Sequence, residues 1–247
     1  MTPEEIVSRI LYRDGLMLII DKPAGLAVHK GPKSSKAAAR GLPSLEDYFD
    51  ALRFGLPRPP VLAHRLDKDT SGCLVLGRHR KATANLNDLF RANKVNKTYW
   101  AVVEGGPKED AGEIDMPLGR LDDTIGWWMK HDPNGLPSQT TWKVMGRAEG
   151  KTGPLTWLAL EPITGRTHQL RVHCSEMGWP IVGDAIYGNA PRNGGPPMHL
   201  HAREIEVPLY KNKAPIKVAA PVPAHMHELL RACGLNQDLN QEPGTVD

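Results

Sequence analysis

Short apolar runs separated by turn-forming residues dominate the chain. Most are four to ten residues long and rich in β-branched, leucine or aromatic side chains, which favours strands over helices. The first run is closed by Asp21-Lys22-Pro23, since proline cannot continue a strand ladder. The strands predicted in this way cover residues 16–20, 73–76, 97–104, 142–145, 154–160, 198–207 and 216–219.

Helical spacing is found in four other segments. Leu45, Phe49 and Leu52 recur at intervals of three and four behind Ser44, a residue type that caps helices. The helices predicted in this way cover residues 45–55, 80–94, 167–177 and 223–233. Because strands outnumber helices and do not alternate strictly with them, we predict an α+β fold with a central, mixed and mostly antiparallel sheet flanked by helices.

The chain shows no internal repeat and no linker that would force a domain boundary. Residues 1–235 are expected to form one domain, and the polar residues 236–247 a disordered tail. The net charge of +3 is compatible with nucleic acid without requiring it. The absence of a secretory leader, of a membrane-spanning run and of paired cysteines predicts a cytoplasmic protein.

The first candidate for chemistry is the segment His64-Arg65-Leu66-Asp67-Lys68-Asp69-Thr70-Ser71-Gly72. Asp67 lies in a turn-forming stretch directly before the apolar run 73–76, so we expect it on a loop at the end of a core strand. Such loops often present reactive groups, although a single aspartate on a loop is more often a solvated charge or a cap.

The second candidate is the segment 163–173, which reads Ile-Thr-Gly-Arg-Thr-His-Gln-Leu-Arg-Val-His. On the predicted helix, Leu170, Cys174 and Met177 would form an apolar face, with Arg171 on the neighbouring face. Placed near Asp67, the guanidinium would favour the ionised carboxylate and orient it. The alternative is that Arg171 is an ordinary surface charge.

These two segments resemble the signature motifs of the RluA family of pseudouridine synthases. Three further segments, 21–29, 97–103 and 180–188, also resemble that family, and all occur in the family's order. The resemblance covers roughly residues 16–222. It departs from the family pattern at Lys30, where a proline often follows Val-His, and at Cys73, where an aliphatic residue is usual.

The resemblance implies an isomerase that converts uridine to pseudouridine in ribosomal or transfer RNA, with its catalytic cleft between two halves of the sheet. Asp67 matches the catalytic aspartate, Tyr99 the tyrosine that packs on the target uracil, and Arg171 the partner of the aspartate. The substrate-contacting positions that it implies are His64, Arg65, Arg166, His168 and Leu170. No cofactor or metal is implied, and we expect a monomer whose partner is RNA.

These residue types suit that reaction. A buried, ionised carboxylate can attack carbon or stabilise an electron-poor sugar while the bond from N1 of uracil to C1′ breaks. The base must leave the stack, which costs a few kcal/mol, and an aromatic face such as Tyr99 recovers about 1–3 kcal/mol by stacking.

Other interpretations remain open. A non-catalytic RNA-binding protein would fit the net positive charge of the chain. A metal-dependent hydrolase could use the pairs His199/His201 and His225/His227. Tyr99 could be a core tyrosine, and Trp127-Trp128 could stack on bases or cover a sheet edge. The basic residues 30–40 could contact phosphates.

Overall fold

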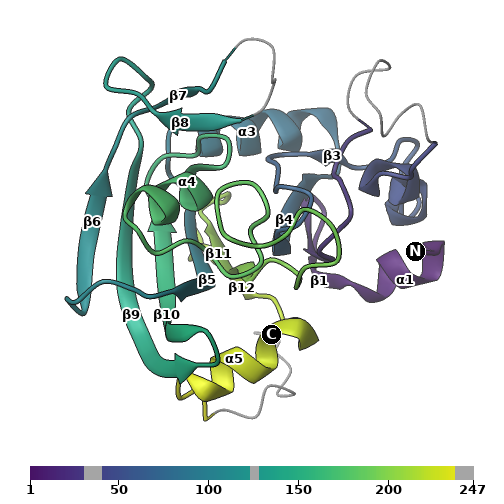
Figure 1. Ribbon diagram of the computed structural model, residues 1–247. Helices are drawn as coiled ribbons and strands as arrows, with labels where there is room; N and C mark the ends of the chain where they lie inside the picture. The colour runs from purple at the N-terminus through teal and green to yellow at the C-terminus, as the bar shows by residue number, and fades with distance from the viewer. Residues whose placement is uncertain (31–40, 123–127, 237–247) are drawn as a thin grey trace. The chain divides into compact units, whose positions relative to one another are not determined.

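The computed structural model describes residues 1–30, 41–122 and 128–236. These residues form two compact units, the first made of 1–95 and 204–221 and the second of 96–203 and 222–236. Figure 1 shows their helices and strands. The proposed tail from 237 onward, Trp127 and most of the basic segment 30–40 lie outside the described residues.

The first unit is built around an antiparallel sheet in which β2 lies between β1 and β4, while the short β3 also pairs with β4. Its elements are α1 (Pro3–Ser8), β1 (Ile10–Arg13), β2 (Met17–Lys22), the 3₁₀ helix η1 (Leu45–Leu52), β3 (Val61–Leu62), β4 (Ser71–Gly77), α3 (Arg80–Arg91) and β12 (Ile216–Ala219). Every residue of β4 is buried, and Leu86 of α3 packs in the same cluster as Val75. The loop of Asp67 therefore leads into the best-buried strand of this unit.

The second unit contains the sheet order β5-β10-β9-β6, in which all neighbours are antiparallel, and a separate β7–β8 pair. Its elements are β5 (Asn96–Glu104), β6 (Ala111–Asp115), β7 (Leu118–Arg120), β8 (Met129–His131), β9 (Gln139–Gly150), β10 (Gly153–Pro162), α4 (Gln169–Glu176), η2 (Ala224–Met226) and α5 (His227–Ala232). Strand β11 (Leu200–Val207) has residues in both units.

The two faces of β5 and β10 carry different cores. Ala101 and Leu158 lie directly opposite each other and belong to a cluster that includes Leu170 of α4. Their neighbours Val102 and Trp157 belong to a second cluster that includes residues of α5. This alternation follows from the twofold period of a strand, and it places α4 over the face that also bears Tyr99.

The α+β class is confirmed, and the elements differ from prediction mainly in their limits. The predicted helix 45–55 is the 3₁₀ helix η1, and the helix predicted over 167–177 begins only at Gln169. Because α4 ends at Glu176, Met177 is 43% exposed and does not belong to the apolar face expected of it. Strand β9 is much longer than the predicted 142–145. In its outer half, exposed side chains alternate with partly buried ones, so the sequence there lacks the apolar run from which the strand was predicted.

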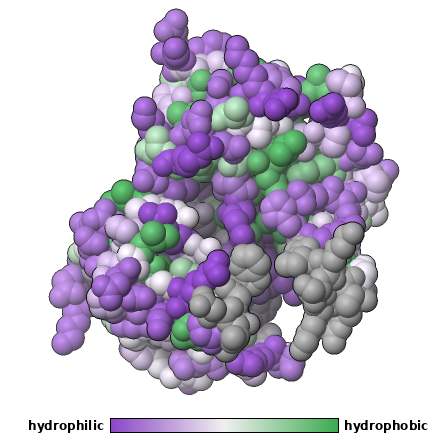
Figure 2. All heavy atoms as spheres, turned by 90° about the horizontal axis from the view of Figure 1, so that it is seen from above, coloured by the Kyte–Doolittle hydropathy of each residue, from purple (hydrophilic) through white to green (hydrophobic). Residues whose placement is uncertain are grey.

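Figure 2 shows a face covered mainly by hydrophilic side chains, with hydrophobic residues scattered among them. Such scattered exposure is ordinary for a folded protein in water. Within the described ranges, no helix combines the length and the apolar character that crossing a membrane requires.

Candidate active site

Asp67 lies on the loop between β3 and β4, as predicted from the sequence. The N–H of Thr70 donates to the Asp67 carbonyl at 3.2 Å and closes a turn, while the adjacent Leu66 is buried. The prediction that the Asp67 side chain is buried is wrong, because it is only partly covered, and Arg65 is exposed. The apolar Leu66 anchors the loop, and the charged side chains on either side of it keep access to solvent.

A buried lysine holds this loop from beneath. The side chain of Lys22 is 0% exposed, and its ammonium donates to the carbonyls of Pro23, Lys68 and Thr70 at 2.8, 2.9 and 2.8 Å. Burial lowers the pKa of Lys22 to about 7, although the negative charges of Asp69 and Asp67 act in the opposite direction. All three protons of the ammonium have acceptors, so Lys22 ties the loop backbone at Lys68 and Thr70 to the end of β2.

His64 fixes the other end of the loop. Its Nε2 accepts a hydrogen bond from the N–H of Val75 at 3.0 Å, and its ring stacks on Phe90 of α3 with the centroids 4.4 Å apart. Through these contacts His64 stabilises the conformation of the loop. They also join the loop to β4 and α3, so Asp67 is carried by a short segment that is held at both ends.

The second unit carries Tyr99 on β5 and Leu170 on α4. Leu170 is 6% exposed within the cluster that contains Ala101, and the partly buried Tyr99 packs against the same cluster. Arg166 is exposed, and its Nε donates to the carbonyl of Pro137 at 3.1 Å. Tyr99 and Leu170 are thus brought to one face of the sheet, as their proposed roles beside a base require.

Arg171 forms a buried bidentate ion pair with Asp184. Its Nε and Nη2 donate to the two carboxylate oxygens at 2.7 and 2.8 Å, and the two side chains are 5% and 1% exposed. Burial by itself would raise the pKa of Asp184, but the hydrogen bonds and charge of Arg171 outweigh it and lower that pKa. The alternative that Arg171 is an ordinary surface charge is therefore wrong.

The same carboxylate organises the turn that follows it. Oδ1 of Asp184 accepts the N–H groups of Ile186 and Tyr187 at 2.9 and 3.1 Å, and the ring of Tyr187 lies 5.1 Å from the guanidinium carbon of Arg171. The Tyr187 hydroxyl accepts the N–H of Met129 at 2.9 Å and lies 2.8 Å from Nδ1 of His168. Asp184 and Tyr187 thus connect Arg171 to His168.

His168 and Gln169 determine how the loop enters α4. His168 has φ 54°, a left-handed conformation that is uncommon for a side chain other than glycine and that occurs often at functional sites. The buried Gln169 accepts from the Thr164 hydroxyl and the Arg166 N–H, and donates to the carbonyl of Gln139 at 2.9 Å. The glutamine of the second motif therefore ties its own loop to β9.

The histidine pairs do not form a metal site in the part of the chain that the structure describes, where no group of three suitable ligands is found. His225 and His227 each place a ring nitrogen beside a backbone carbonyl, at 3.2 and 2.9 Å. His199 does the same with the carbonyl of Pro197 at 2.9 Å. These rings are occupied by local backbone contacts.

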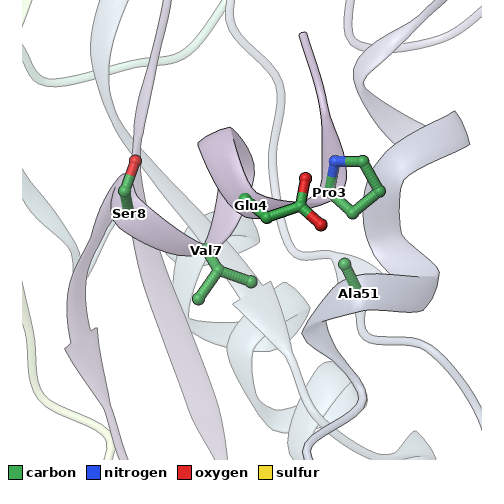
Figure 3. Close-up of a pocket in the computed structure, with 5 residues that line it drawn as sticks. All are labelled: Pro3, Glu4, Val7, Ser8 and Ala51. Atoms are coloured by element: carbon green, nitrogen blue, oxygen red, sulfur yellow. The ribbon is translucent and has the colours of Figure 1, made fainter.

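A pocket of about 450 Å³ lies between α1 and η1 (Figure 3). It is lined by Pro3, Glu4, Val7, Ser8 and Ala51. None of these belongs to the predicted site, and the backbone and threonine hydroxyl around Glu4 lower the pKa of that carboxyl, so it would be a poor proton donor near neutral pH. This pocket does not change the choice of candidate site.

The structure thus places the predicted residues in two groups. His64, Arg65 and Asp67 share one loop of the first unit, and Tyr99, Arg166, His168, Leu170 and Arg171 lie on β5 and at the start of α4 in the second. Sequence reasoning assigned no role to Lys22, Gln169, Asp184 or Tyr187. All four fall within segments that resemble the family, but hydrogen-bonding partners far away in the sequence give them their importance.

Comparison with known proteins identifies the family of the chain. The family model described as RNA pseudouridylate synthase matches residues 16–176. An uncharacterized RNA pseudouridine synthase of Zymomonas mobilis is 39% identical over 226 residues, which is 91% of this chain and 98% of that protein. A ribosomal large subunit pseudouridine synthase C of Vibrio parahaemolyticus is 33% identical, covering 92% of this chain and 69% of its own length.

Two solved human structures share the fold. RNA pseudouridylate synthase domain containing 4 aligns with a TM-score of 0.72 and 27% identity, covering 92% of this chain and 95% of that one. RNA pseudouridylate synthase domain containing 1 gives a TM-score of 0.71 and 26% identity, covering 99% of both chains. The chain belongs to the RNA pseudouridine synthases of the RluA type, isomerases that convert uridine to pseudouridine in RNA.

The Lys22 contacts predict a large loss of stability on truncation. Lys22→Met leaves the carbonyls of Pro23 and Thr70 without the Lys22 donor, while the Lys68 carbonyl keeps the N–H of Gly25. We expect the free energy of unfolding to fall by about 2 kcal/mol or more. Lys68→Met removes an exposed lysine from the same loop and is expected to change stability by less than about 0.5 kcal/mol. Urea unfolding at pH 6, below the Lys22 pKa of about 7, checks both variants, and equal stabilities would contradict the anchoring role.

The buried ion pair predicts a second, pH-dependent loss. Asp184→Asn removes the buried carboxylate that is paired with the Arg171 guanidinium and should cost about 3–5 kcal/mol at pH 7. Asp110→Asn removes the carboxylate of the exposed Arg147–Asp110 pair and should cost less than about 1 kcal/mol.

The pH dependence follows from the lowered Asp184 pKa. A carboxyl whose folded pKa lies below its unfolded value of about 4 stabilises the protein above that value. This contribution is lost as the pH falls through the folded pKa, so the gap between wild type and Asp184→Asn should narrow below pH 4. A gap that is constant from pH 7 to pH 3 would contradict the assignment.

Proposed function

We propose that this protein isomerises specific uridines of ribosomal RNA through an essential aspartate, Asp67. The relatives named as large-subunit enzymes support ribosomal RNA as the substrate, with transfer RNA as the alternative. The observation that carries the proposal is the placement of Asp67 on a loop that Lys22 and His64 hold at both ends, leaving the carboxylate partly open to a ligand. We propose that it acts as a monomer in the cytoplasm, without metal or cofactor.

In the proposed reaction, the carboxylate of Asp67 stabilises or attacks the fragment that forms when the bond from N1 of uracil to C1′ breaks. The uracil turns, C5 bonds to C1′, the proton on C5 leaves, and N1 takes up a proton, so no atom is gained or lost overall. Whether the carboxylate reacts with the sugar or with the base is decided by trapping the intermediate.

Arg171 is proposed to supply a positive charge. Asp184 binds the Nε and Nη2 groups and so orients the guanidinium, which carries five N–H groups in a rigid fork. In this proposal the oriented guanidinium acts on the Asp67 carboxylate during the reaction. Tyr99 and Leu170, which share one cluster, would then receive the flipped uracil against an aromatic and an apolar surface.

The first test is release of tritium from RNA labelled at C5 of uridine, which reports loss of the C5 proton. Wild-type protein should release tritium from ribosomal RNA, and Asp67→Asn should abolish the release while binding RNA about as tightly. Asp69→Asn alters an exposed carboxylate two residues away and should keep near-wild-type turnover. An Asp67→Asn protein with wild-type turnover would refute the essential aspartate, and RNA binding without release by the wild type would favour a non-catalytic RNA-binding protein.

The role of Arg171 needs a double variant, because Arg171→Met alone would leave the Asp184 carboxylate buried and unpaired. Combining Arg171→Met with Asp184→Asn removes both charges and should recover much of the folding stability that the single change loses. We expect kcat to stay about 10²-fold below wild type in the double variant, with little change in KM. A parallel loss in RNA affinity and turnover would indicate a phosphate contact instead.

A further inference from the structure

Lys97 lies on β5 two residues before Tyr99, and so both side chains leave the strand on the same face. This is the face that packs against Leu170 and the start of α4. The lysine side chain is partly buried. Its position beside two residues that are proposed to receive the base makes its ammonium a candidate for contact with the same RNA.

Burial removes part of the water around the Lys97 ammonium, and no interaction with the described residues replaces it. Among the described residues, none gives it a hydrogen bond, an ion pair or a nearby opposite charge, and burial alone lowers its pKa to about 8. Lys22 shows the contrasting case, a buried ammonium with three carbonyl acceptors. A lysine that is partly buried and left without a partner costs stability, which is a common property of binding positions.

The ammonium also faces an open backbone segment. Outside Gly165 and its two chain neighbours, its Nζ is the nearest heavy atom to the point where a Cβ at Gly165 would lie, at 4.0 Å. Gly165 belongs to the exposed loop that runs from β10 to α4 and carries Arg166 and His168. Because Gly165 has no side chain, nothing from that position covers the lysine, and a ligand that follows the loop could reach both cations.

We propose that Lys97 binds a backbone phosphate of the RNA next to the uridine that is isomerised. The ligand class follows from the chemistry: a compact ammonium without an acceptor is matched by an anionic oxygen, and RNA offers one at each nucleotide. The loop of Gly165 supplies the adjoining positive charge of Arg166. This inference rests on the proposed function, because Tyr99 defines where the uracil would lie.

The test compares Lys97→Gln with two controls. Lys97→Arg keeps the charge, and Lys143→Gln removes an exposed lysine of β9. Lys143 and Trp100 both lie opposite Ala159, so they share one face of the sheet. Lys97 and Tyr99 lie on the other face, because they alternate with Trp100 along β5. RNA affinity is measured between 50 and 300 mM salt, and thermal unfolding and tritium release are measured on the same proteins.

We expect Lys97→Gln to weaken RNA binding about tenfold at low salt and to reduce the slope of log affinity against log salt by about 0.7, the value for one single-strand phosphate contact. Lys97→Arg should retain most of the affinity, and Lys143→Gln should behave as wild type. The melting temperature of Lys97→Gln should equal or exceed that of wild type, because an uncompensated charge is removed.

Two results would overturn the phosphate contact. One is an unchanged salt slope in Lys97→Gln, and the other is a lower melting temperature that accounts for the loss of binding. Both are distinct from failure of the proposed function, which would appear as wild-type protein that releases no tritium. If wild type is active and Lys97→Gln keeps its salt slope, only the role of Lys97 is rejected.

Discussion

The geometry of the loop that carries Asp67 depends on one buried lysine. Lys22 donates to the carbonyls of Lys68 and Thr70 in the Asp67 loop and to that of Pro23 at the end of β2. The Lys68 carbonyl also accepts the N–H of Gly25, so Lys22 matters most for the acceptors at Thr70 and Pro23. The arrangement lets a short, turn-rich segment hold one conformation while its carboxylate stays accessible. A rigid support of this kind is what a reacting group needs, since a misplacement of about 1 Å can cost 10²-fold in rate.

The second unit uses charge in two different ways. Arg171 has a dedicated carboxylate in Asp184, which orients the guanidinium before any substrate arrives. Lys97 has no such partner and lies partly covered beside Tyr99. The first arrangement favours precise positioning of a charge, and the second favours the capture of an anion.

The sequence predicted the α+β class, most strands of the two sheets, the loop that carries Asp67 and the residues at the start of α4. These features depend on local signals, namely apolar runs, turn residues and ordered motifs. It did not predict the left-handed His168, the length of β9, or the roles of Lys22 and Asp184. The outer half of β9 lacks a continuous apolar signal. The roles of Lys22 and Asp184 depend on partners 48 and 13 residues away, Thr70 for Lys22 and Arg171 for Asp184, and a single sequence does not show such pairings. Burial of Asp67 was wrongly expected because its neighbour Leu66 supplies the burial instead.

The central claim is that Asp67 carries out the isomerisation of uridine in cellular RNA. The most direct measurement is a map of pseudouridines in total RNA from cells that lack this gene and are complemented with wild type, Asp67→Asn or Asp69→Asn. The account predicts that defined ribosomal sites disappear on deletion, return with wild type and Asp69→Asn, and stay absent with Asp67→Asn. Restoration of those sites by Asp67→Asn would contradict it.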